Sequence, residues 1–152
     1  MLCSSQALSF GADGHRIVVA IAEKHISSKT AAAIKAITAD TDLGKLSLWP
    51  DTIRHLPTWE QSKYWHYVSI DDHERFNSLE RHSEGDVLSA LEYFRTQLQN
   101  PELDAQQLES LAFLIHFVAD IHQPLHVGRR DDRGGNKIRV KWLDQAKTTN
   151  LH

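Results

Sequence analysis

The chain has 152 residues, 41% of them hydrophobic and 24% charged, which fits a single globular domain with a substantial core. Its formal net charge of -3 neither indicates nor excludes a polyanionic partner, because bound divalent cations can reverse the local field. The single cysteine, Cys3, excludes an intrachain disulfide framework and a multi-cysteine zinc site, and no apolar stretch is long enough to span a membrane.

The first nine residues resemble the end of a secretory signal. Ala7 and Ser9 are small residues at the -3 and -1 positions of a cleavage before Phe10. We therefore expect residues 1–9 to be a leader remnant and the mature protein to be secreted or periplasmic. The alternative is an ordinary disordered N-terminus.

The first half of the chain predicts short helices. Asp13 is a candidate N-cap for a helix that continues to Ile26 and carries His15 in its first turn. Ser28 is expected to cap an alanine-rich helix over residues 30–38. Residues 46–54 predict a short helix that Pro50 breaks, and the aromatic-rich residues 59–68 are expected to begin as helix and end extended.

The second half predicts two longer helices and a small β element. Residues 87–98 are amphipathic, and residues 104–122 form the longest predicted helix, which Pro124 must terminate. The Gly-Gly pair within residues 133–136 indicates a tight turn, and residues 137–142 alternate like a short strand. The predicted class is all-α, with a small hairpin-like β element near residues 133–142.

Four potential metal ligands fall within eleven residues near the end of the longest predicted helix. His116 and Asp120 are spaced i, i+4, which places an imidazole and a carboxylate on one helix face. Their neighbours are almost all apolar, so the helix is expected to be buried, and a buried charge is costly unless something binds it. A bound cation is the simplest explanation. His126 follows the terminating proline, whereas His122 lies off the shared face and favours a structural role.

Three further candidates are ambiguous when each is taken alone. His15, taken alone, is more typical of a surface residue at a helix start than of a metal ligand. Asp51 precedes Arg54 by three residues, so a salt bridge at a helix end is the simpler reading. His66, between two aromatic residues, is compatible with a hydrogen-bonded core histidine.

Six motifs resemble, in their order and spacing, those of the S1/P1 nuclease family. These are the zinc-dependent, single-strand-specific nucleases of fungi, plants and some bacteria. The resemblance covers essentially all of residues 10–152 and implies a multi-helix bundle of the zinc phospholipase C and single-strand nuclease type. The motifs occupy residues 10–15 (FGADGH), 48–54 (LWPDTIR), 65–67 (WHY), 116–120 (HFVAD), 123–126 (QPLH) and 132–136 (DRGGN).

The resemblance implies three zinc ions in a complete family member. The positions that match the first zinc site are Asp51, His66, His116 and Asp120. The second site shares Asp120 and matches His15 together with the amino nitrogen and carbonyl oxygen of Phe10. The third matches His126 and the histidine of a later His-x-x-x-Asp pair, which corresponds to His152.

The implied reaction is metal-assisted hydrolysis of single-stranded DNA and RNA to 5'-phosphate products, with 3'-nucleotidase activity. Asp120 is implied to be catalytic because two metals share it, and Arg54 would stabilise the negative charge of the transition state. Asn136 and Ser69 are the candidate substrate contacts, although Asn136 is equally compatible with a plain turn residue. Trp49, Trp65 and Tyr67 are candidate stacking platforms or core residues. No protein partner is implied.

The chain also departs from the family pattern. Phe10 replaces a tryptophan, and as a metal ligand it requires removal of the leader, because an amide nitrogen binds zinc poorly. Ser69 stands where fungal members have a substrate-contacting aspartate, for which Asp71 and Asp72 are the alternatives. No aspartate follows His152, so residues 10–152 are expected to be the N-terminal part of one nuclease domain.

Two other functions remain as hypotheses. One is a zinc phospholipase C-like phosphodiesterase on the same scaffold. The other is an inactive, truncated fragment that binds zinc.

Overall fold

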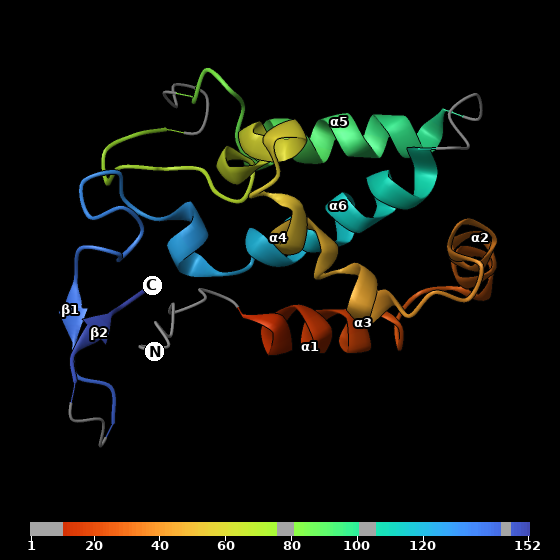
Figure 1. Cartoon of the computed structure of the whole chain (residues 1–152), viewed down its shortest axis with the longest axis horizontal. Coiled ribbons are helices and arrows are strands. Elements are labelled where there is room, and N and C mark those ends of the chain that lie inside the picture. Colours follow the sequence, from red (N-terminus) through yellow and green to blue (C-terminus); the bar gives the residue numbers. More distant parts are fainter. Residues whose placement is uncertain (1–10, 76–80, 101–105, 144–146) are drawn as a thin grey trace.

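The computed structural model describes residues 11–75, 81–100, 106–143 and 147–152, and these form a mostly helical molecule (Figure 1). The helices are α1 (Ala12–Ala22), α2 (Ser28–Thr38), α3 (Leu43–Leu46), α4 (Trp49–Ile53), α5 (Val87–Gln99) and α6 (Gln107–Asp120), with 3-10 helices η1 (Pro57–Tyr64) and η4 (Pro124–Val127). The strands β1 (Arg139–Val140) and β2 (Thr149–Asn150) pair antiparallel, with Arg139 opposite Asn150. The predicted all-α class with a small β hairpin is confirmed.

Helix α6 is the central element of the fold. It lies between α5 on one side and α1 on the other (Figure 1). One face packs against α5, where Phe113 stacks on Phe94 with ring centroids 4.4 Å apart. The opposite face carries His116 and Asp120 towards α1, α3 and α4. A helix with neighbours on both sides needs apolar residues all round, which explains the composition of this segment.

Aromatic side chains fill the core between α4, α5 and α6. Trp49 packs edge-on against Phe113, and Trp65 contacts both Phe94 and Phe113. The indole nitrogen of Trp65 donates to the carbonyl of Glu84. Of the two roles considered for these aromatic residues, Trp49 and Trp65 therefore have that of core residues, whereas Tyr67 is 39% exposed.

Several predicted helix boundaries were wrong for local reasons. Helix α1 begins at Ala12 after Gly11 and ends at Ala22, so Asp13 lies inside the first turn, where it pairs with Arg16. Ser27, not Ser28, caps α2 by accepting a hydrogen bond from the Thr30 backbone nitrogen.

The predicted break at Pro50 was also wrong. Pro50 lies in the first turn of α4, where its missing N–H costs nothing, and the chain breaks earlier, between Leu46 and Trp49. The start predicted for the longest helix, residues 104 and 105, lies outside the described residues.

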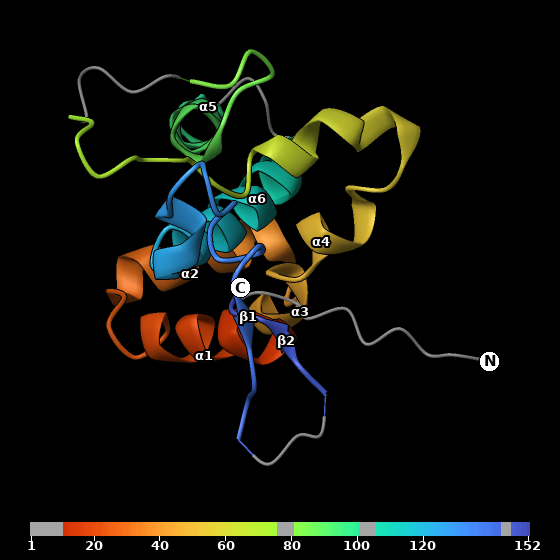
Figure 2. The ribbon, with the colours of Figure 1, turned by 90° about the vertical axis from the view of Figure 1, so that its left-hand side faces the viewer.

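The segment after α6 closes one end of the molecule. Gln123 accepts a hydrogen bond from the Leu125 nitrogen at the start of η4, and Pro124 prevents α6 from continuing. The backbone nitrogens of Val68 and Ile70 donate to the carbonyls of His126 and Gly128. The β1–β2 hairpin lies at this end, which faces the viewer in Figure 2. These contacts bring distant parts of the sequence to one site.

Candidate metal centre

Asp120, at the end of α6, is surrounded by four imidazole rings. Its carboxylate is 1% exposed, so it reaches these rings inside the protein rather than through solvent. The Oδ2 atom lies 2.9 Å from His66 Nδ1 and 3.2 Å from His116 Nε2. The Oδ1 atom lies 3.3 Å from His126 Nδ1 and 3.5 Å from His15 Nε2. A buried carboxylate with this many imidazoles is typical of a metal centre.

The four histidines around Asp120 come from four different parts of the fold, and His116 lies on α6 with Asp120 itself. His15 lies on the buried face of α1, where its ring stacks on that of His116 with centroids 3.9 Å apart. His66 follows η1, and His126 lies in η4. The predicted ligands therefore meet because α1, α6 and two loop segments converge at the end of α6.

Backbone carbonyls fix the orientation of three histidines. A carbonyl oxygen only accepts hydrogen bonds, so each bonded Nδ1 must carry the proton, which leaves the Nε2 lone pair for a metal. Such outer contacts orient metal-binding histidines in proteins. The Nδ1 atoms of His116, His126 and His152 donate to the backbone carbonyl oxygens of Ser47, His66 and Gly134, respectively, and each donor lies 2.6 Å from its acceptor.

The electrostatics favour an ionised Asp120 and neutral His15 and His66, the protonation states that a metal needs, whereas the hydrogen bond and charge of Asp120 outweigh burial and raise the pKa of His116. Although burial opposes it, the neighbouring imidazoles of His116 and His66 hold the pKa of Asp120 far below its usual range. Burial, reinforced by the His116 charge, lowers the pKa of His15 to about 4. Burial also lowers the pKa of His66. An ionised carboxylate and neutral imidazoles are the ligand forms that cations bind.

The donor set fits a metal ion. Two groups of side chains place their ligand atoms within 4.8 Å of one another: His15, His116 and Asp120, and Asp51, His66 and His116. The Nε2 atom of His66 is buried without a hydrogen-bond partner in the described part of the chain, which costs free energy unless a ligand uses it. Imidazole and carboxylate together suit zinc.

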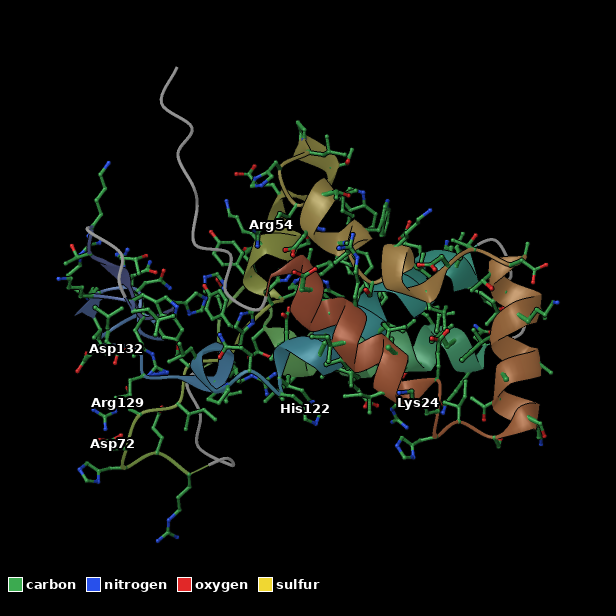
Figure 3. All side chains as sticks on the ribbon, turned by 90° about the horizontal axis from the view of Figure 1, so that it is seen from below. Lys24, Arg54, Asp72, His122, Arg129 and Asp132 are labelled. Carbon is green, nitrogen blue, oxygen red and sulfur yellow. The ribbon has the colours of Figure 1, made fainter. Side chains whose placement is uncertain are left out.

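Asp51 and Arg54 lie at the rim of this cluster. Their side chains are 31% and 28% exposed, and Arg54 Nη1 lies 3.1 Å from Asp51 Oδ1. Asp51 Oδ1 is also 3.9 Å from His116 Nε2. The salt bridge expected from sequence is present, and it places the Arg54 guanidinium beside the cluster, where Figure 3 shows it projecting from the helices.

A cleft of about 970 Å³ opens beside the cluster. The predicted metal ligands His66, His126 and His152 line it, as do the predicted substrate contacts Ser69 and Asn136. The Asn136 amide is bonded within its own turn, to the Arg133 carbonyl and to the Asn150 side chain, so its contact with substrate stays a prediction.

Asp71 and Asp72 do not replace an aspartate at position 69. Asp71 accepts hydrogen bonds from the backbone nitrogen and the Nη1 of Arg130, and Asp72 pairs with Arg129 at 2.7 Å. Figure 3 shows Asp72 and Arg129 together, away from the helices. Both carboxylates are engaged in joining two loops, and neither lines the cleft.

Two other predicted residues lie apart from the cluster. Phe10, expected to bind a metal through its backbone, lies outside the described residues. His122 is exposed and donates through Nδ1 to the Val118 carbonyl, and its side chain points away from the cleft (Figure 3). Its position off the shared helix face explains this separation.

The tight turn near the end of the chain positions His152. Gly134 has a φ of 58°, its carbonyl accepts from His152, and a Cβ on it would overlap the Leu125 carbonyl oxygen. The turn that the Gly-Gly pair predicted is therefore present. The backbone of this turn approaches Leu125 closely, and the His152 ring stacks on His126 with centroids 5.2 Å apart.

We expect Gly134→Ala to damage this corner of the site selectively. The added methyl group forces the turn away from Leu125, costing about 1–3 kcal/mol and separating His152 from His126. Thermal unfolding should show a lower midpoint, and zinc analysis a loss confined to the His126 and His152 site. The control is Gly44→Ala, where the new methyl group meets only side-chain atoms, Asp42 Oδ1 at 3.2 Å and Arg16 Cγ at 3.5 Å, and no backbone. Equal metal contents in the two variants would contradict the positioning role of Gly134.

Comparisons with known proteins agree with the geometry. A family model described as S1/P1 Nuclease matches residues 10–152. Endonuclease 4 of Arabidopsis thaliana is 36% identical, covering 96% of this chain and 54% of that protein. Nuclease S1 of Aspergillus oryzae is 30% identical, covering 91% and 50%, and Nuclease P1 of Penicillium citrinum is 29% identical, covering 94% and 55%. The chain therefore spans about half the length of the curated relatives it matches.

Proposed function

Because this chain belongs to the S1/P1 nuclease family, we propose that it forms the metal-binding part of a zinc-dependent endonuclease. The substrates are single-stranded DNA and RNA, the products carry 5'-phosphates, and 3'-nucleotides are further substrates. The observation that carries this proposal is the buried Asp120 carboxylate, ringed by four imidazoles, beside a cleft. Its relatives are nucleases by name, which favours this reaction over that of a phospholipase C.

Three zinc sites follow from the residues present. Asp51, His66, His116 and Asp120 would hold one ion, and His15 and Asp120 would share in a second with the backbone of Phe10. For the third we propose His126 and His152. Zinc bound there supplies a Lewis acid for the phosphate and lowers the pKa of coordinated water. The second site needs a free amino group on Phe10, so we also propose leader cleavage before Phe10 and a secreted or periplasmic protein.

The side chains divide the remaining work. Asp120 stays ionised because its imidazole neighbours lower its pKa, so it keeps its affinity for cations well below neutral pH. The Arg54 guanidinium, at the mouth of the cluster, is positioned to donate hydrogen bonds to the phosphate oxygens as their charge grows. Arg54 therefore binds the reacting group, while Asp120 holds the centre together.

Burial of the cluster supports a preference for single strands. His15 and Asp120 are each 1% exposed and His116 is 0% exposed, so a phosphate must enter the cleft to reach them. A single strand can bend its backbone inwards and turn its bases aside, whereas a stacked duplex holds its phosphates on a rigid outer surface.

None of the helices in the described residues has the length and hydropathy to cross a bilayer.

The test is hydrolysis by zinc-loaded protein of a labelled single strand, the same sequence as a duplex, and phosphatidylcholine vesicles. We expect cleavage of the single strand with 5'-phosphate ends, at least tenfold slower cleavage of the duplex, and loss of activity after chelation with EDTA. Release of phosphocholine without DNA cleavage would instead favour the phospholipase hypothesis. Zinc binding without any hydrolysis would favour the inactive fragment.

A further inference from the structure

The charges lining the cleft are strongly segregated. The whole chain has a formal net charge of -3, yet among the described residues five cationic side chains and one side-chain carboxylate, that of Asp86, line the cleft. The cationic residues are Arg54, Lys63, Arg81, Arg130 and Arg133. A cleft that gathers cations in an acidic protein favours an anionic ligand longer than one phosphate.

Four of these five cations are paired with carboxylates. Arg54 lies 3.1 Å from Asp51, Lys63 lies 3.0 Å from Glu60, and Arg130 lies 2.7 Å from Asp71. Arg81 forms a two-pronged pair with Asp86, the residue that caps α5. These pairs reduce the positive charge that each side chain offers to a ligand.

Arg133 is different, because no ion pair joins it to a carboxylate of the described residues. It is exposed and lines the same cleft as Tyr67. A guanidinium that no described carboxylate neutralises, in a cleft that is also lined by an exposed aromatic side chain, is well suited to the phosphate of a nucleotide.

The backbone at Arg133 is also unusual. Its φ of 55° lies in the left-handed region, which an L-residue adopts at an energetic cost that glycine avoids. The two residues that follow, Gly134 and Gly135, share positive φ values. Strained backbone concentrates at functional sites, and here it holds an arginine where glycine would serve the turn better.

We propose that Arg133 binds a phosphate flanking the one that is cleaved, so that the cleft prefers oligonucleotides to substrates with a single phosphate. This inference rests on the proposed nuclease function, which supplies the strand. In this proposal Arg133 contributes to the preference for longer strands and takes no part in the hydrolysis itself. Phosphate binding by a guanidinium also predicts a dependence of affinity on salt.

The substitution Arg133→Gly tests the proposal, because it removes the guanidinium and suits the backbone. The probes are fluorescent phosphorothioate thymidine oligomers of eight nucleotides and of two, measured by anisotropy on zinc-loaded protein. We expect the eight-nucleotide affinity to fall about tenfold, as for loss of a charged hydrogen bond, and the two-nucleotide affinity to stay unchanged. The slope of log affinity against log salt should fall by about 0.7.

Two controls separate the side chain from its surroundings. Arg129→Gln removes a positive charge from the same loop but outside the cleft, and Leu143→Gly relieves a positive φ of 46° at an exposed residue. Both should bind the eight-nucleotide probe like the parent protein. The melting temperature of Arg133→Gly should be unchanged or higher, whereas a purely structural arginine would lower it.

Three outcomes would overturn the inference: equal losses for both probes, an unchanged affinity for the longer one, or no binding of it by the parent protein. Hydrolysis of an unmodified single strand is measured in parallel. Its absence, with Arg133-dependent binding retained, would refute the nuclease proposal and leave the inference standing. Hydrolysis of the strand, together with an affinity that does not depend on Arg133, would support the nuclease proposal and refute the inference about Arg133.

Discussion

Asp120→Ala should remove metal from two sites at once and abolish hydrolysis. The carboxylate lies between His15 and His126 on one oxygen and between His66 and His116 on the other, so its loss removes an anion that four imidazoles share. Loss of a contact outside the ligand shell typically lowers metal affinity by about 10–100-fold, so loss of the shared ligand should exceed that range. Zinc content after dialysis and cleavage of single-stranded DNA are the measurements.

Asp72→Ala is the matched control for this substitution. It removes an exposed carboxylate that pairs with Arg129 outside the cleft, and it should leave zinc content and rate unchanged. Because removing Asp120 also leaves buried imidazoles without their anion, circular dichroism must show that the variant remains folded. A folded Asp120→Ala protein that retains activity would refute a metal centre organised around Asp120.

Arg54→Ala should separate catalysis from metal binding. The guanidinium lies at the rim of the cluster and no metal ligand is lost with it, so zinc content should match that of the parent protein. Removing one preorganised donor to a developing negative charge costs about 10²–10³ in kcat, and we expect a loss of that size with a smaller change in KM. Steady-state kinetics on a single-stranded oligonucleotide provide both values.

Arg54→Lys tests whether charge alone is sufficient. A lysine keeps the positive charge but loses the two-pronged geometry that matches a phosphate, so only part of the rate should return. Loss of zinc from Arg54→Ala would show instead that the pair with Asp51 holds a ligand in place. In that case Arg54 would be a positioning residue rather than a catalytic one.

The sequence predicted local features of the site better than its assembly. The i, i+4 spacing of His116 and Asp120 requires only helix geometry, and the apolar residues around them predicted burial in the right helix. By contrast, no spacing within the chain indicates that His15 reaches Asp120, because that contact depends on how α1 packs against α6. The resemblance to a nuclease family supplied this expectation, and the structure brings the two side chains within 3.5 Å.

Other features had no signal in the sequence. The Ser47 carbonyl orients His116, but every residue has a carbonyl, so no residue type marks it. Pro50 was predicted to break a helix because proline is unfavourable in helix interiors, yet the first turn tolerates it. Arg133 was not singled out, because its positive φ and its lack of a carboxylate partner in the described residues emerge only after folding.

The most direct test of the metal centre is the zinc-to-protein ratio of the chain beginning at Phe10, determined by elemental analysis after loosely bound metal is removed. The described residues include ligands for two proposed zinc sites that share the Asp120 carboxylate, so we expect at least two tightly bound zinc ions per chain. A chain that retains none, or only one that is weakly held, would contradict it.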